Sequence, residues 1–401
     1  MRGEYPAVLI GDVCDICLGK MLDQKKNRGV YKKYLGNSNV RWGYFDLADL
    51  SEMKFEDNES DRYGIIKGDL VICEGGEPGR CAIWDDELPN MMIQKALHRV
   101  RAKEKNLLIQ YLYYWLIWAG QNHLLEAYFT GTTIKHLTGR ALAKIQFPLP
   151  HMEVQSSIAA TLSCLDDKIE LNNRIITNLE SQAQAIFKSW LVDFEPFQDG
   201  EFEESELGLI PKGWKVGTLK DICHYSNDRV AVETLNDEIY ISTENMLPNK
   251  QGFVKATSLP TTAYTTAYHS GDVLISNIRP YFKKIVFCYG DGGCSTDVIC
   301  FVVNEGVPSE YLFHLLYNDT FFDFMVGGSK GTKMPRGDKQ QLMQYPVVQP
   351  DDKWLSEFER VAQPMLLQSY TLKQENERLA QTRDTLLPKL MSGKIEVPVE
   401  G

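Results

Sequence analysis

The sequence predicts an α+β protein built from two globular domains and two long helices, and three observations lead to this class. The 401 residues repeat with a step of 200, because the windows 131–150 and 331–350 align without a gap, as do 111–116 and 311–316. Each half ends in about 40 residues whose apolar positions recur at spacings of three and four. Short apolar runs between turn residues, typical of strands, fill the rest. Two related halves in one polypeptide predict a pseudo-two-fold molecule.

The expected domains follow the chain in order. We expect globular domains over 1–150 and 211–350, long helices over 151–195 and 351–393, a linker over 196–210 and a tail over 394–401. Strands are predicted in 64–73 and 268–276, where an apolar run follows Gly-Asp, and helices over 111–118 and 311–317. The N-terminal entry 5–16 lacks the Gly-Trp of 213–214, which predicts a shorter opening strand.

The long helices carry a heptad pattern. In the first helix one row is Ile158, Leu165, Asn172, Leu179 and Ile186, and the other is Leu162, Ile169, Ile176, Ala183 and Trp190. The second helix has Phe358, Met365, Leu372, Leu379 and Leu386, then a more polar row of Ala362, Ser369, Asn376, Arg383 and Leu390. A helix of 40 residues is roughly 60 Å long and cannot bury its own stripe, so an antiparallel pair is expected. Asn172 either fixes the register or points to solvent at the rim.

Prolines and a glycine mark the helix ends. The first helix is expected to end before Pro196. Pro364 predicts a kink, or the start of the straight part of the second helix, and Pro388 acts likewise near its end. Gly393 fits a helix stop.

Composition places the chain among folded proteins, with 43% hydrophobic and 11% aromatic residues. The absence of an apolar stretch of about 20 residues and of a signal peptide predicts a cytoplasmic protein with no membrane contact. The nine cysteines are scattered, which predicts reduced thiols. Cys14 and Cys17 form the single C-x-x-C, without the second ligand pair that zinc requires, so no metal is expected and Cys14 should face a core.

The formal net charge of −11 argues against unaided binding to nucleic acid. The acidic residues, however, gather in 46–61, 195–206 and 350–359, which leaves basic loops elsewhere. The acidic net charge also indicates that a partner subunit contributes to DNA binding.

A search for catalytic motifs finds none. The glycines and lysines of 327–333 do not have the order of a phosphate-binding loop, and the glycine clusters 74–80 and 290–294 favour hairpin turns over dinucleotide binding. The motif that holds a target amine in an amino-methyltransferase is absent, and 350–353 lacks the second acid and lysine of a nuclease.

Basic, amide and aromatic residues instead recur in loops of both domains, and this combination can read base edges and bind phosphates. A structural or solvated role competes with DNA contact at each single position. The cluster 276–284 is the strongest, and Thr132, Lys135, Thr332 and Lys333 occupy repeat-related positions suited to phosphate contact. The predicted DNA-binding residues are Asn39, Arg41, Trp42, Tyr44, Gln94, Lys95, Arg99, Thr132, Lys135, Thr243, Asn245, Asn277, Arg279, Tyr281, Lys283, Lys284, Thr332, Lys333 and Arg336.

Segments 181–197 and 382–397, the helix from 155 onward and the entry motif 210–222 resemble the specificity (S) subunit of type I restriction–modification systems. The resemblance covers the whole chain. It implies a non-catalytic subunit whose two recognition domains read the halves of a split, asymmetric site on double-stranded DNA. Its helices would be the spacer and the docking surface for two methyltransferase (M) subunits, and restriction (R) subunits could then join.

The same resemblance implies no cofactor on this chain, with S-adenosylmethionine, ATP and Mg expected in the partner subunits. The helix pair predicts half-sites about 34 Å apart, near one turn of DNA. The alternative function is a stand-alone DNA-binding regulator or an anti-restriction decoy, but the polar row with Ser369, Asn376 and Arg383 favours a partner interface. An isolated chain could also pair with a second copy. The helix-seam residues expected to be buried are Leu162, Leu165, Ile169, Asn172, Ile176, Leu179, Ile186, Trp190, Leu372, Leu379 and Leu386.

Overall fold

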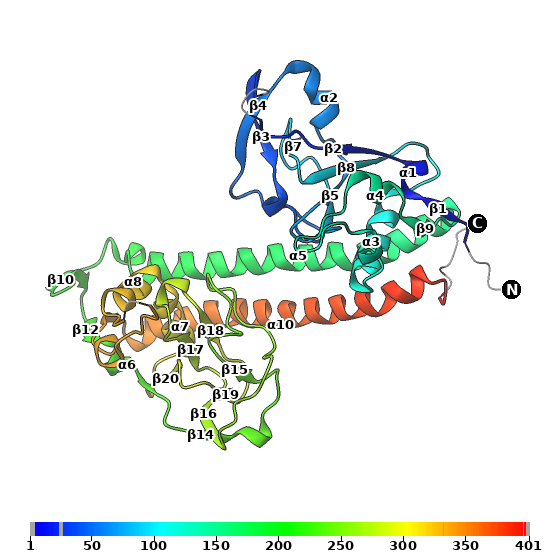
Figure 1. Cartoon of the computed structure of the whole chain (residues 1–401). Coiled ribbons are helices and arrows are strands. Elements are labelled where there is room, and N and C mark those ends of the chain that lie inside the picture. The colour runs from blue at the N-terminus through cyan, green and yellow to red at the C-terminus, as the bar shows by residue number, and fades with distance from the viewer. Residues whose placement is uncertain (1–4, 24–26, 332, 396, 398–401) are drawn as a thin grey trace. The chain divides into compact units, whose positions relative to one another are not determined.

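The structure is a computed structural model that describes residues 5–23, 27–331, 333–395 and 397. By its internal contacts the chain divides into two compact units, of which unit 1 comprises residues 1–170 and 376–401 and unit 2 comprises residues 171–375. Each unit therefore holds one globular part and a portion of both long helices, α5 (Met152–Leu191) and α10 (Asp352–Met391), which Figure 1 shows in green and in orange to red.

The globular part of unit 1 combines short helices with short strands. Its helices are α1 Ile10–Val13, α2 Ser60–Tyr63, α3 Ile109–Gln121 and α4 Gly139–Ala143. Its strands are β1 Ala7–Leu9, β2 Cys14–Leu18, β3 Val30–Leu35, β4 Ser51–Phe55, β5 Leu70–Cys73, β6 Cys81–Ile83, β7 Met92–Ile93, β8 Leu97–Ala102 and β9 Gln146–Pro148. They form an antiparallel sheet of order β2-β8-β5-β6, a sheet of order β4-β3-β7 and the pair β1-β9.

Unit 2 repeats this plan. Its helices, apart from its portions of α5 and α10, are α6 Leu219–Ile222, α7 Ser309–Tyr317, α8 Asp319–Gly327 and α9 Lys339–Leu342. Its strands are β10 Phe202–Ser205, β11 Gly208–Pro211, β12 Lys215–Thr218, β13 Cys223–Tyr225, β14 Arg229–Ala231, β15 Tyr240–Ile241, β16 Tyr264–Tyr268, β17 Val273–Ser276, β18 Ile285–Phe287, β19 Gly292–Cys294, β20 Val298–Val303 and β21 Pro346–Gln349.

The strand orders show the repeat directly. The sheet β13-β20-β17-β18 corresponds strand for strand to β2-β8-β5-β6, and the pair β12-β21 corresponds to β1-β9. The predicted strands and helices are confirmed as β5 and β17 and as α3 and α7. The opening strand β1 has three residues against four in β12, as expected. The sequence repeat is therefore a repeat of the fold.

In each unit the main sheet and its helix pack on the long helices. The core of unit 1 includes Ile158 and Leu162 from α5 and Leu387, Leu390 and Met391 from α10. That of unit 2 joins its sheet and α7 to both long helices through Phe187, Leu191, Leu355, Phe358 and Ala362. Apolar burial is the main stabilising contribution to such cores. Neither globular part builds its core from its own residues alone.

Within each unit the two helices run antiparallel. In unit 2 Asn172 donates to Glu375 over 2.8 Å, Lys373 donates to Glu180 over 2.7 Å, and the rings of Phe187 and Phe358 lie 5.6 Å apart. Residue numbers rise along one helix as they fall along the other. Asn172 is fully buried, so it lies inside the helix pair, where its bond to Glu375 fixes the register.

The polar row of α10 also lies between the helices. Ser369 is only 3% exposed, and Arg383 donates to Asp166 of α5 over 2.7 Å within unit 1. Tyr114 of α3 donates to the other oxygen of Asp166 over 2.7 Å. The expectation that Ser369 and Arg383 serve a partner interface is corrected, because these groups have internal positions.

The helix ends follow their local sequence. α10 ends in a Schellman motif, in which Lys394 N–H donates to Lys389 O over 2.9 Å and Gly393 N–H donates to Leu390 O over 3.1 Å. Gly393 has φ +66°, a value that glycine accepts without strain. α5 ends at Leu191, before Pro196 as predicted, whereas α10 already starts at Asp352 and continues through Pro364.

The segment predicted as a linker is an ordered hairpin of β10 and β11. Aromatic packing holds this hairpin in place, since the ring centroid of Phe197 lies 4.9 Å from that of Trp214 and 4.5 Å from that of Trp354.

The nine cysteines are free, and Cys14 is buried as expected. No described helix is long and apolar enough to cross a membrane.

Candidate nucleic-acid interface

Three loops occupy corresponding places in the two units. The first loop follows β3 or β15 and covers 36–46 or 242–254. The second loop joins β5 to β6 or β17 to β18 and covers 74–80 or 277–284. The third loop precedes α4 or α9 and covers 130–136 or 330–336. Most of the predicted DNA-binding residues lie in these loops.

In unit 1 hydrogen bonds join the three loops. Arg80 of the second loop donates to Asn37 O of the first loop over 2.9 Å, and Trp42 Nε1 donates to Glu77 over 2.6 Å. Leu137 N–H, directly after the third loop, donates to Glu74 O over 2.7 Å. These contacts make the loops one connected surface.

Unit 2 uses the same connections with different residues. Lys284, which corresponds to Arg80, donates to Thr243 O of the first loop over 2.6 Å. Burial lowers the pKa of the Lys284 ammonium group. Arg279 N–H donates to Pro335 O of the third loop over 2.8 Å, and Gly337 N–H donates to Asn277 O over 3.2 Å. The second loop thus lies between the other two.

The second loop has a left-handed backbone at two corresponding places. In unit 1 these places hold Gly76 and Gly79, with φ +73° and +94°. In unit 2 they hold Arg279 and Lys283, with φ +51° and +50°, on either side of a 3-10 turn. A non-glycine residue in this conformation costs about 1–2 kcal/mol. Such strain typically occurs at functional sites, so two cationic side chains where glycine would fit point to a function for them.

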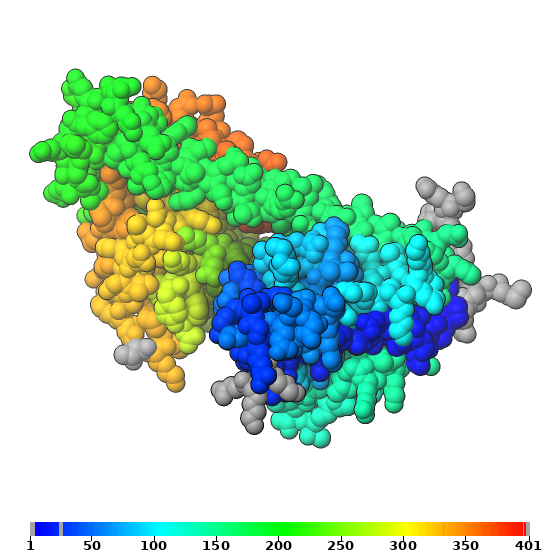
Figure 2. Space-filling model, turned by 90° about the horizontal axis from the view of Figure 1, so that it is seen from above, coloured from blue at the N-terminus to red at the C-terminus, as the bar shows by residue number. Residues whose placement is uncertain are grey.

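The predicted DNA-binding residues fall into three groups by exposure. The exposed ones are Tyr44, Lys95, Thr132, Lys135, Arg279, Tyr281, Lys333 and Arg336. The half-buried ones are Arg41, Trp42, Gln94, Thr243, Lys283 and Lys284. The buried ones are Asn39, Arg99, Asn245 and Asn277. Thr332 lies outside the described residues. In the space-filling view the stretch around 320–340 of unit 2, in gold, forms part of the surface (Figure 2).

The buried members serve their own domains. Arg99 donates to Asp15 over 3.0 Å and to the carbonyl oxygens that end α2, among them that of Arg62. Asn39 and Asn245 bind the backbone of their own loops. Asn277 is 8% exposed, and its side-chain oxygen has no hydrogen-bond partner among the described residues.

Several exposed or half-buried cations are already paired. Arg336 lies 3.0 Å from Asp297, and Lys283 lies 3.1 Å from Asp319 at the start of α8. Arg41 makes a looser pair with Asp46 at 3.5 Å. Within the described chain Arg279 forms no ion pair, so its guanidinium keeps its donors for a ligand.

The predicted seam positions are all buried or half-buried. Leu162, Asn172 and Ile176 are buried. The half-buried ones are Leu165, Ile169, Leu179, Ile186, Trp190, Leu372, Leu379 and Leu386.

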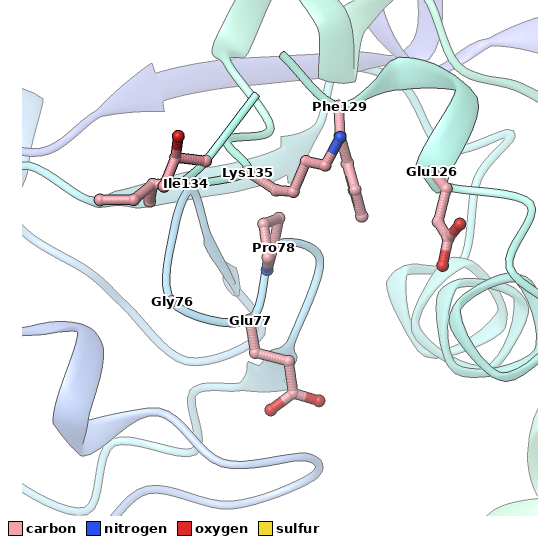
Figure 3. A pocket seen from close by; sticks show the side chains of 8 residues that line it. Gly76, Glu77, Pro78, Glu126, Phe129, Ile134 and Lys135 are labelled. Atoms are coloured by element: carbon pink, nitrogen blue, oxygen red, sulfur yellow. The ribbon is translucent and has the colours of Figure 1, made fainter. Parts of the chain in front are cut away.

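A recess of about 540 Å³ lies beside the second and third loops of unit 1 (Figure 3). Its lining includes Glu77, Pro78, Glu126, Phe129 and Lys135. In Figure 3 the Lys135 side chain extends toward Phe129. Carboxylates beside one cation do not suit a phosphate, although a carboxylate can accept a hydrogen bond from a cytosine amino group. Among the described residues no group of three or more metal ligands comes together.

Sequence reasoning missed some residues of this surface. Arg80 and Glu77 connect the loops of unit 1, but an isolated arginine or glutamate carries no signal of such a role. Ile134 and Met334 are exposed apolar residues of the third loops, 64% and 49% exposed. A signal for them existed, because the ungapped repeat aligns two apolar residues in an otherwise polar loop.

Comparison with known proteins gives one consistent result. Residues 4–181 match the model of the type I restriction modification DNA specificity domain. The chain is 26% identical to the type I restriction enzyme MjaIX specificity subunit of Methanocaldococcus jannaschii, over 82% of this chain and 78% of that protein. It is 22% identical to the HindI specificity subunit of Haemophilus influenzae, over 82% and 87%.

Among solved structures the fold is similar to the S subunit of a type I restriction-modification system from M. genitalium. The TM-score is 0.61 at 17% identity, and 99% of this chain and 97% of that chain are covered. The two repeated domains and the long helices of this chain thus have a counterpart over the full length of that subunit. Residues 4–181 thus belong to the type I restriction modification DNA specificity domain family, and over about four fifths of its length the chain is similar to type I specificity subunits.

Proposed function

We propose that the chain reads a two-part DNA site, with residues 1–150 and 211–350 each recognising one half. The observation that carries this proposal is the three-loop surface, which recurs in both units on different residues. A repeated scaffold with different loop residues suits two half-sites of different sequence. The protein would then bind such an asymmetric site in only one orientation.

Contacts with bases and with phosphates would come from different residues. Arg279 is exposed and projects from a strained loop, and its fork of donors matches the two acceptors of guanine in the major groove. Thr132, Lys135 and Lys333 are exposed, and their chemistry suits phosphate contact. We assign Asn39 and Asn245 to loop structure, and Arg99 of β8 to the packing of β2 and α2, because their polar groups already bind the protein.

The two halves would be read by different chemistry. The second loop of unit 2 carries three cations, Arg279, Lys283 and Lys284, whereas its counterpart 74–80 carries two glutamates and one arginine. Each phosphate that a cation neutralises steepens the salt dependence of binding by about 0.9 in log–log slope. Any of these three cations that reaches a phosphate would make the contacts of unit 2 the more salt-sensitive.

The long helices would present the surface for the partner subunits. Their inward faces are used within the chain, but Leu171 on α5 and Leu367 on α10 are 49% and 52% exposed. Two methyltransferase subunits would dock on such outward positions and supply S-adenosylmethionine chemistry. Restriction subunits with ATP and Mg would join them, in the cytoplasm where the DNA is.

The experiment that tests this function is single-molecule sequencing of modified bases in a host free of methylation. The host carries the chain with its neighbouring methyltransferase gene, or that methyltransferase alone. A split motif that is methylated only with the chain present is the expected result. Absence of any motif in both samples contradicts the proposal. The Arg279→Ala chain is the matched variant, since it should relax one half of the motif and leave the other unchanged.

A further inference from the structure

Ile134 and Met334 are large apolar side chains that occupy one and the same position of the repeat, on the exposed third loop of each unit. They are 64% and 49% exposed. A single exposed apolar residue is ordinary on a protein surface. The same exposure at two positions 200 residues apart, in loops whose other residues are only partly alike, calls for a common cause.

Both loops hold these residues on a closed backbone. Thr130 and His136 exchange two backbone hydrogen bonds of 2.8 Å. Lys330 and Arg336 exchange the equivalent pair at 2.9 and 3.0 Å. Backbone closure of this kind fixes where the tip side chain is presented. Figure 3 shows the Ile134 side chain directed away from Lys135 and Phe129, although Ile134 also contributes to the lining of the recess.

A cation is adjacent in sequence to each apolar tip. Lys135 follows Ile134 in sequence, and Lys333 and Arg336 flank Met334. The backbone bond from Arg279 to Pro335 also places the cationic second loop of unit 2 against this tip. An apolar side chain beside a cation is complementary to a ligand that carries anionic groups on its outside and apolar atoms between them. Duplex DNA has this character, because thymine methyl groups and base steps lie between its phosphate strands.

We propose that Ile134 and Met334 are specificity-determining residues that make an apolar contact with the bases, one in each half-site. This inference rests on the proposed function and deepens it. Lys135 beside the first tip and Lys333 beside the second bind phosphates and bring each loop to the groove. The apolar side chain then gains affinity only where a methyl group or an easily opened base step meets it.

Binding measurements on the full chain test the proposal. The probe is a labelled duplex that carries the split motif found by methylation mapping, with a scrambled duplex for comparison. Ile134→Ala and Met334→Ala should each weaken binding to the motif by roughly 5- to 50-fold, as expected for losing most of one buried apolar side chain. Ile66→Ala is the matched control. It removes the same side chain, 56% exposed, from the turn at the opposite end of β5, and should bind like the unchanged chain.

Further binding measurements distinguish the loss of an apolar contact from other causes of weaker binding. The slope of log Kd against log salt should stay unchanged in Ile134→Ala, because an apolar contact releases no counterions, whereas Lys135→Ala should reduce it by about 0.9. In a duplex with one half of the motif scrambled, one of the two variants should cause no further loss. Uracil in place of thymine should reproduce the loss if a methyl group is the contact. If base opening is the contact, DNA bending should decrease instead.

Unchanged binding in both variants, while the unchanged chain still discriminates the motif, overturns the inference and leaves the proposed function intact. A weaker affinity with an altered salt slope also overturns it, because the loss would then be electrostatic. Failure of the unchanged chain to distinguish the motif from the scrambled duplex overturns the proposed function itself.

Discussion

Asn39 and Asn245 stand at the same position of the repeat and share two side-chain hydrogen bonds to the backbone of their loops. Each side-chain oxygen accepts from the backbone N–H three residues earlier, over 2.9 and 2.6 Å. Each side-chain nitrogen donates to two carbonyl oxygens, of which those of Asp46 and Val254 correspond in the repeat. Both amide hydrogens are thus in use, and neither remains for a base.

Asn245→Ala should therefore destabilise unit 2 and leave the sequence preference of the chain unchanged. The buried carbonyl groups would lose their donor, which costs about 1–3 kcal/mol. Urea unfolding gives the loss of stability, and binding to the motif and to single-base variants of it gives the preference. The exposed Asn227→Ala serves as control. A changed base preference without a change in stability would show instead that Asn245 reads DNA.

Two replacements of Arg279 should distinguish the energetic cost of its left-handed backbone from the contribution of its side chain to DNA recognition. Arg279→Ala removes the side chain and keeps the left-handed strain, whereas Arg279→Gly removes both. The glycine variant should be more stable than the alanine variant by about 1 kcal/mol. Both should lose discrimination in one half-site by about 1–3 kcal/mol. Equal weakening on all sequences would mark Arg279 as a phosphate contact.

The spacing between half-sites should follow the length of the helices. One heptad added after Glu170 in α5 and another after Glu375 in α10 lengthens each helix by about 10 Å, or roughly three base pairs. Methylation mapping should then return both half-motifs unchanged with a longer spacer. A heptad in α5 alone should abolish the methylation, because it puts the seam out of register. If the chain with both insertions still directs methylation to sites with the original spacer, the proposal that helix length sets the spacing is wrong.

Acid should destabilise unit 2 through His314. Burial lowers the pKa of His314 to about 3 from its ordinary 6.5. Its ring contacts Gln184, Phe187 and Phe358, none of which carries a charge. Below about pH 6.5 the unfolded chain binds a proton that the folded chain does not. Stability should fall there by about 1.4 kcal/mol per pH unit, down to about pH 3.

The thermal unfolding midpoint at pH 7.5 and 5.5 measures this effect in the unchanged chain and in His314→Gln. Glutamine stays neutral and can still donate to Gln184. The variant should lose less stability on acidification than the unchanged chain. An identical loss in both would assign the pH dependence to other groups, such as His98, whose pKa burial also lowers.

The sequence predicted those features that depend on local pattern. The seam spacing gave the long helices, Gly393 gave the end of α10, and the Gly-Asp turns gave β5 and β17. The roles of Asn39 and Arg99 could not be predicted, since both residue types suit DNA contact and only the folded backbone supplies their internal partners. The left-handed backbone conformation of Arg279 could not be predicted from the sequence either. It emerges only when the structure aligns it with Gly76.

The division of α5 and α10 between the units has a consequence for how the protein is made. The core of unit 1 includes Leu387, Leu390 and Met391, which are synthesised after all 205 residues of unit 2. At about 5–20 residues per second the ribosome needs roughly 10–40 s to pass from Glu170 to Glu375. During this time the nascent first domain exposes apolar surface where α10 will lie. Unit 2 can complete its fold first, although its residues come second.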